Sequence, residues 1–246
     1  VVLSLGLLFE WTSEKKDQAA QDHLNNALKS SFDFAGGGFV LIENEELQVV
    51  VAVETGAIIE TRLKQYPVED IEGALGFRVF GESSSTSFAY YFKSGFTSIT
   101  PSYKLQGSGQ DYVVLVDDML GITKRISFLP ASYEISIVDS SMNGVQGKSF
   151  AGLYRTEGRA LDLKRDALSG GMMNNSSYEG IAISTESDPY STSRLGGIDE
   201  PMESLSRSGW VAFIQKYFFA AILGSDEYIY NYYVLPKESG LFRMGY

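Results

Sequence analysis

The sequence predicts a mainly β fold with little helix, and two observations lead to this prediction. The chain carries 15 Tyr, 15 Phe and 25 Gly but only 6 Pro, and aromatic rings fit the pleated, half-buried surface of a strand. Its apolar residues also gather in short runs between turn-forming residues, which is typical of strands. At 246 residues, the chain lies near the upper limit for a single hydrophobic core.

The folded domain is expected to begin near Phe39. Leu47–Val53 is a nearly continuous run of apolar residues, Glu54–Gly56 interrupts it, and Ala57–Leu63 resumes it. This pattern predicts two strands joined by a turn. Shorter runs of the same kind predict five further strands, at Phe77–Phe80, Phe88–Phe92, Tyr112–Val116, Ile122–Phe128 and Tyr133–Val138.

The last three of these strands show apolar residues at alternate positions, which predicts one core-facing side for each. The turn between the first two of them is expected at Asp117–Gly121. The residues assigned to the core-facing sides are Tyr112, Val114 and Val116, then Ile122, Ile126 and Phe128, then Tyr133, Ile135 and Ile137.

The C-terminal part of the chain is less regular. Arg159–Pro201 is polar and rich in turn residues, with one predicted strand at Tyr178–Ser184. Two aromatic strands are predicted near the end, at Tyr228–Leu235 and Leu241–Met244. No internal repeat of fixed period is present.

The block Gly209–Leu223, with the sequence GWVAFIQKYFFAAIL, is the most apolar part of this region. It is too short to span a bilayer, and Gln215 and Lys216 interrupt it. A run this apolar hides its period, so it predicts either one core helix or a pair of strands. Its role is either core packing or a surface that binds a partner.

The N-terminus predicts the compartment. Val1–Trp11 is an apolar run with one charge, about half of the length needed to span a membrane. Trp11 suits an interfacial anchor, which favours the end of a retained transmembrane helix at residues 1–11. A signal-peptide core has the same length, and a buried strand is a third alternative. Residues 12–38 are polar, end on three glycines and predict a linker, which leaves residues 39–246 as the domain.

Composition argues against several classes of function. With 20 Lys and Arg against 31 Asp and Glu, the formal net charge is -11, so a nucleic-acid partner is not expected. The chain has no cysteine and a single histidine, His23, which lies in the predicted linker. Thiolate chemistry, histidine-dependent triads and multi-histidine metal sites are therefore not expected. We predict no catalytic site, no cofactor and no metal.

Three short motifs resemble binding loops but lack the spacing that such loops need. Gly147–Ser149 lacks the preceding glycine of a phosphate-binding loop, because position 142 is Met, and it predicts a turn between two strands. Asp117–Asp118 and Asp226–Glu227 lack the alternating spacing of a calcium loop. They predict solvated acidic turns.

Two segments, Ile42–Pro67 and Gly209–Leu223, carry a family resemblance, and Thr123–Val138 shares it more loosely. Ile42–Pro67 reads IENEELQVVVAVETGAIIETRLKQYP, Thr123–Val138 reads TKRISFLPASYEISIV, and the Gly209–Leu223 block follows near the end. Together with the apolar N-terminal run and the polar linker, they resemble the first periplasmic domain of YidC-type membrane protein insertases. The chain departs from that family at Gly56–Ala57, where a Gly-Gly turn is usual, and the sequence of Arg159–Pro201 does not allow a family segment to be assigned to it.

The resemblance implies a β-supersandwich related to the galactose-mutarotase fold, in the periplasm and attached to the bacterial inner membrane. It implies a role in inserting and folding inner-membrane proteins, alone or with the Sec translocon, so the implied partners are translocon subunits and nascent membrane proteins. The last strands of the domain and the insertase core are expected beyond Tyr246. Trp210, Tyr217 and Phe218 are expected either to line a partner groove or to support the core.

Two other functions compete with this interpretation. The mutarotase relationship suggests a sugar-binding or sugar-converting protein, but that chemistry commonly uses a glutamate and a histidine, and the predicted domain contains no histidine. A structural β-domain is the second alternative, and composition alone does not distinguish it.

Overall fold

In the computed structural model, the described residues are 38–67, 75–82, 88–145, 147–157, 179–194, 197–215, 218–236 and 242–246. The predicted membrane-helix end at residues 1–11 and nearly all of the predicted linker at 12–38 lie outside these ranges, as does His23. The described part is built almost entirely of strands, which confirms the mainly β prediction.

The largest element is an antiparallel sheet of nine strands. The sheet order departs from the chain order after β5, where four strands from later in the chain complete the sheet. In sheet order the strands are β1 (Phe39–Glu43), β2 (Leu47–Ala52), β3 (Ala57–Pro67), β4 (Gly76–Glu82), β5 (Phe88–Phe96), β10 (Ser149–Glu157), β17 (Phe242–Gly245), β16 (Tyr230–Pro236) and β13 (Met202–Ser206).

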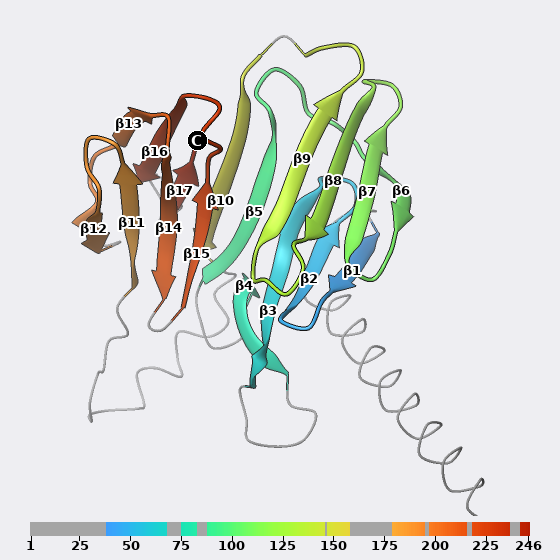
Figure 1. The fold of residues 1–246 in the computed structure, drawn as a ribbon, viewed down its shortest axis with the longest axis horizontal. Coiled ribbons are helices and arrows are strands. Elements are labelled where there is room, and N and C mark those ends of the chain that lie inside the picture. The colour runs from blue at the N-terminus through green and yellow to red at the C-terminus, as the bar shows by residue number, and fades with distance from the viewer. Residues whose placement is uncertain are drawn as a thin grey trace, which may run out of the picture.

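Two sheets of four strands each pack on one face of the large sheet. The first consists of β6 (Lys104–Ser108), β7 (Tyr112–Asp117), β8 (Ile122–Phe128) and β9 (Ile135–Ser141), and β7 of this sheet contacts β1. The second consists of β12 (Ser191–Arg194), β11 (Glu179–Thr185), β14 (Gly209–Gln215) and β15 (Phe218–Leu223), and β14 contacts β16 and β17. Figure 1 shows the small sheets side by side over opposite ends of the large one.

One apolar core joins the three sheets. Val51 and Leu153 of the large sheet, Ile126 of the first small sheet and Phe213 of the second all belong to one cluster of buried side chains. The architecture is therefore a β-sandwich. Its relation to the galactose-mutarotase fold stays a prediction.

Every strand predicted from an apolar run is present, with bounds shifted by a few residues. The runs do not predict β1, β6, β10, β12 and β13. Polar residues dominate β12, with the sequence STSR, and β13, with the sequence MESLS. Such strands are held by backbone pairing with their neighbours, and their own sequence carries little signal.

The assignment of the core-facing side of β7 was wrong. Val113 and Leu115 are buried, whereas Tyr112, Val114 and Val116 are only partly buried. The reason lies in the register: Val113 pairs with Ile126 of β8, and directly opposed residues share a face of the sheet. All five residues from 112 to 116 are apolar, so alternation within β7 cannot select the face.

On the neighbouring strands the prediction was more successful. Ile122 and Ile126 of β8 are fully buried, and Ile135 and Ile137 of β9 pack against the core. Tyr133 was wrongly assigned, because it precedes β9 and is half exposed.

Two of the short motifs behave largely as predicted. Gly147 and Lys148 lie between β9 and β10, so the turn prediction is confirmed. Asp226 and Glu227 form an exposed turn. Asp117, in contrast, is buried rather than solvated.

The Asp117 carboxylate accepts hydrogen bonds from the Ser102 N–H at 2.9 Å and the Leu120 N–H at 3.0 Å. These bonds, that from Ser102 most strongly, lower the pKa of Asp117. Its role is to hold the β7–β8 turn.

Candidate functional site

The Gly209–Leu223 block forms a hairpin of β14 and β15, so the strand-pair alternative is confirmed and the helix alternative was wrong. The register runs from Gln215 opposite Phe218 to Trp210 opposite Leu223. Residues 216 and 217 lie outside the described residues. The predicted groove residue Tyr217 is therefore not described. β14 also pairs along its whole length with β11, which places the hairpin at one side of the second small sheet.

The two described groove candidates, Trp210 and Phe218, lie on opposite faces of this hairpin. Trp210 shares a face with its partner Leu223, and Phe218, five residues before Leu223 on the same strand, points to the other face because side chains alternate. The sheet therefore separates these two residues, and they do not line a common groove.

Phe218 faces the large sheet. Its ring stacks on Phe77 of β4 with a centroid distance of 4.3 Å, and it meets Tyr66 of β3 edge-on at 5.3 Å. Aromatic contacts of this kind stabilise the packing beyond simple area burial. Phe218 thus supports the seam between the second small sheet and the large sheet.

The other face of the hairpin points away from the sandwich and is apolar. We call it the outer face of the hairpin, and it comprises Trp210, Ala212 and Ile214 of β14 and Phe219, Ala221 and Leu223 of β15. Phe219 is 69% exposed and Leu223 is 62% exposed. Trp210 is partly covered and lies 6.1 Å from Tyr190, between ring centroids. Ala212 is only 1% exposed, and Ile214 and Ala221 are partly covered, so Phe219 and Leu223 form the exposed part of this face.

Sequence reasoning singled out the block but did not find Phe219 and Leu223. The available signal was the two-residue alternation from Phe219 through Ala221 to Leu223, which becomes meaningful once the block is known to be a strand pair.

A tyrosine of β16 ties the open end of the hairpin to the large sheet. The Tyr232 hydroxyl donates to the Gly209 carbonyl at 2.8 Å and accepts from the Gly224 N–H at 3.2 Å. Tyr232 is fully buried, and burial raises the pKa of its hydroxyl. The outer face is therefore presented on a rigid element.

The most chemically distinctive cluster of the described residues surrounds Lys124 of β8. Its Nζ lies 2.7 Å from Asp139 Oδ1, 2.6 Å from Ser94 Oγ and 3.1 Å from the Ser94 carbonyl oxygen. The Ser94 hydroxyl in turn donates to Asp139 Oδ2 at 2.6 Å. Desolvation lowers the pKa of Lys124, while Asp139 acts in the opposite direction.

A lysine beside a serine hydroxyl resembles a nucleophile with its base, but Lys124 is fully buried and Ser94 nearly so. The cluster joins β8 and β9 to β5 across the sandwich, so its role is structural.

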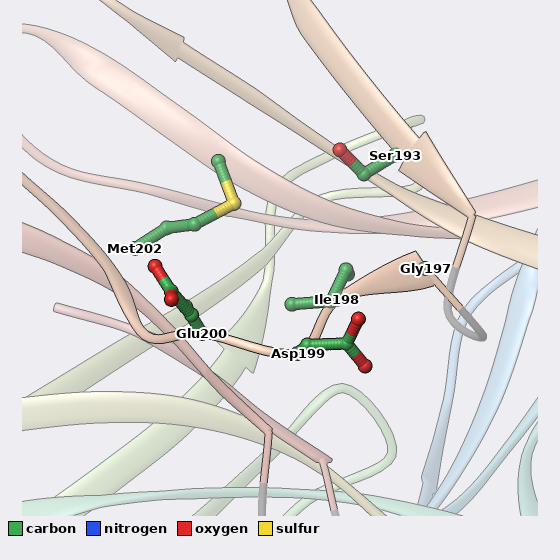
Figure 2. A pocket seen from close by; sticks show the side chains of 6 residues that line it. All are labelled: Ser193, Gly197, Ile198, Asp199, Glu200 and Met202. Atoms are coloured by element: carbon green, nitrogen blue, oxygen red, sulfur yellow. The ribbon is translucent and has the colours of Figure 1, made fainter.

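A hollow of about 370 Å³ lies at the opposite edge of the second small sheet. Figure 2 shows its lining: Ser193, Gly197, Ile198, Asp199, Glu200 and Met202. Binding pockets for small molecules are usually concave and lined by apolar and aromatic side chains. This hollow is open and includes two carboxylates but no aromatic ring, so it does not support the sugar-binding alternative.

The described residues provide neither a metal-binding cluster nor a membrane-spanning helix. They contain no group of three or more side chains able to hold a metal ion. They also contain no helix long and apolar enough to cross a membrane.

Comparison with known proteins decides the family. The family described as the YidC periplasmic domain matches residues 40–246. The chain belongs to this family. The YidC periplasmic domain therefore corresponds to the described sandwich.

Individual relatives support the same assignment. The membrane protein insertase YidC of Azotobacter vinelandii is 25% identical over 222 residues, which cover 80% of this chain and 38% of that protein. The insertase YidC of Pseudoalteromonas translucida is 23% identical, over 93% of this chain and 44% of that protein. The insertase YidC of Hahella chejuensis is 25% identical, over 96% of this chain and 43% of that protein. This chain thus spans about two fifths of the length of these curated relatives.

The family also gives the location. The matched domain is periplasmic and the relatives are membrane insertases, so this YidC domain lies on the periplasmic side of the bacterial inner membrane. The hairpin that carries the outer face falls inside the matched range.

Proposed function

We propose that this domain is the periplasmic docking element of a membrane protein insertase. In this proposal it helps inner-membrane proteins to insert and fold, alone or beside the Sec translocon, and performs no catalysis itself. The observation that carries the proposal is the exposure of Phe219 and Leu223 on the apolar outer face of the β14–β15 hairpin. The insertase names of the relatives and the periplasmic family match support it.

Energetics favours a partner for this face. Phe219 and Leu223 each expose most of their side-chain surface, and covering apolar surface is worth roughly 25 cal/mol per Å². A nascent membrane protein is rich in apolar side chains, so it offers the matching chemistry. The neighbouring Tyr232 contacts keep the hairpin in place, which reduces the entropy lost on binding.

The absence of catalysis is supported by the chemistry of the described residues. The polar cluster at Lys124 is enclosed, and the residues that line the acidic hollow at Asp199 and Glu200 include no histidine or lysine. General acid–base catalysis needs positioned groups that a substrate can reach.

Site-specific photo-crosslinking in membranes tests the proposal. A photoreactive amino acid replaces Trp210 or Phe219 in the full-length insertase, and the matched control replaces Met119, which is 95% exposed on a turn of the other small sheet. We expect translocon subunits or insertion substrates to be captured from the two hairpin positions and not from Met119. Equal capture from all three positions, or none, would refute the docking role and leave core packing as the function of the hairpin.

A further inference from the structure

Within the described ranges of the chain, the three sheets have six edge strands, and one of them differs from the rest. Five edges carry a charged residue: Glu43 in β1, Glu203 in β13, Arg194 in β12, Lys104 in β6 and Asp139 in β9. The sixth edge, β15, reads FFAAIL and has neither a charge nor a proline. Charges and prolines on edge strands are a common protection against pairing with other chains. β15 lacks this protection.

The backbone of β15 is also available for pairing. On one side it pairs with β14, and within the described part of the chain no strand pairs with its other side. Every second residue of an edge strand directs its N–H and C=O away from the sheet. The inner face of β15 packs over β4 and β10, so the strand is held in an extended conformation.

We propose that β15 binds an extended apolar segment of an insertion substrate by strand addition. This inference deepens the proposed function and rests on it. The added strand would extend the second small sheet to five strands, and its side chains would cover Phe219 and Leu223 of the outer face.

The chemistry of β15 selects this occupant. Its six residues span about 20 Å, and a membrane-spanning segment before insertion supplies about 20 consecutive apolar residues. In strand addition the main chain provides affinity and alternate side chains provide selectivity. An uncharged edge therefore favours segments without charged side chains. A second copy of this chain is a poorer occupant, because two molecules of formal charge -11 repel each other.

Peptide binding to the 246-residue chain tests the inference. The probe is a fluorescent peptide of about eight residues, sufficient to match the strand length, in which Val and Thr alternate between terminal lysines. A second peptide of the same sequence carries N-methyl groups on alternate amides, which removes donors on one edge. We expect the first peptide to bind and the N-methylated peptide to bind at least about tenfold more weakly.

Charged substitutions locate the binding edge. Phe219→Lys and Leu223→Lys introduce edge protection at exposed positions, so the fold is expected to tolerate them. We expect each to weaken peptide binding about tenfold, in line with the loss of one or two hydrogen bonds and an apolar contact. Leu205→Lys is the matched control, because Leu205 is 72% exposed on the edge strand β13 and its substitution should change binding less than about twofold. Amide hydrogen exchange in β15 should slow when the peptide binds.

Three results would overturn the inference. These are equal binding of the N-methylated peptide, equal effects of Leu205→Lys and Phe219→Lys, and self-association of the chain that Leu223→Lys abolishes. The last result would make a second copy the occupant. Failure of strand addition is distinguishable from failure of the proposed function: crosslinks from Trp210 in membranes without peptide binding at β15 would leave the docking role intact and remove only its strand-addition mechanism.

Discussion

Replacing Asp139 with alanine tests how the sandwich tolerates its buried lysine. Lys124 is 0% exposed, and the Asp139 side chain is only 12% exposed. Asp139→Ala removes the carboxylate 2.7 Å from Lys124 Nζ and leaves the hydroxyl and carbonyl of Ser94 as its polar contacts. The ammonium group then lies between two sheets without a counter-charge.

The expected loss of stability is large. Breaking a buried ion pair by removing one partner costs about 3–5 kcal/mol, because the remaining charge is uncompensated. Removing both charges avoids that penalty. The double variant Lys124→Met and Asp139→Ala should therefore lie within about 1–2 kcal/mol of the wild type, although Ser94 then loses two polar partners.

Urea unfolding of the four proteins of this double-mutant cycle measures the coupling between Lys124 and Asp139. The Asp139→Ala penalty, taken relative to the wild type at each pH, should shrink as the pH rises. Desolvation lowers the pKa of Lys124, so the lysine loses its charge at a lower pH in the folded state than in the unfolded state.

Equal destabilisation by Asp139→Ala and by the double variant would refute this reasoning. It would mean that the loss of packing at position 139, rather than the unpaired charge, sets the cost. A penalty independent of pH would lead to the same conclusion.

Three further predictions follow from individual contacts. Gly56→Ala should cost about 2 kcal/mol or more, because Gly56 has φ of 63° and an added Cβ would lie 2.7 Å from the buried Lys124 side chain. Phe218→Ala should cost about 2 kcal/mol, and Trp210→Ala less than about 1 kcal/mol, because only Phe218 packs against the large sheet. Stability should fall as the pH rises from 10 toward 12, because burial raises the pKa of Tyr246 from 10.0 to about 12.

Each of these predictions has a direct check. Gly107→Ala is the control for Gly56→Ala, since an added Cβ there meets nothing within 4 Å, and equal costs would contradict the strain argument. Thermal or urea unfolding ranks Phe218→Ala against Trp210→Ala, and a larger loss for Trp210→Ala would reverse the assignment of faces. For Tyr246, the raised pKa means that the hydroxyl keeps its proton to a higher pH in the folded state than in the unfolded state. A free energy of unfolding that stays unchanged above pH 10 would contradict this shift.

The amino-acid sequence by itself determined the fold class and most of the strands. It also shows directly that the chain has no cysteine. The fold class and the strands follow from local composition and from runs of apolar residues. A strand is about five to ten residues long, so its signal lies within its own stretch of sequence. The segments that carry the family resemblance, such as Ile42–Pro67 and Gly209–Leu223, are equally local. The family match over residues 40–246 confirmed that resemblance.

Only the tertiary structure decided which face of each strand is covered. Alternation along β7 could not select Val113 over Val114, because both are apolar and the choice depends on pairing with β8. The same applies to Trp210 and Phe218, which the hairpin separates onto opposite faces. The unprotected edge of β15 and the burial of Lys124 depend on which strands become neighbours. Those neighbours are brought together by long-range pairing, and no residue within a strand encodes them alone.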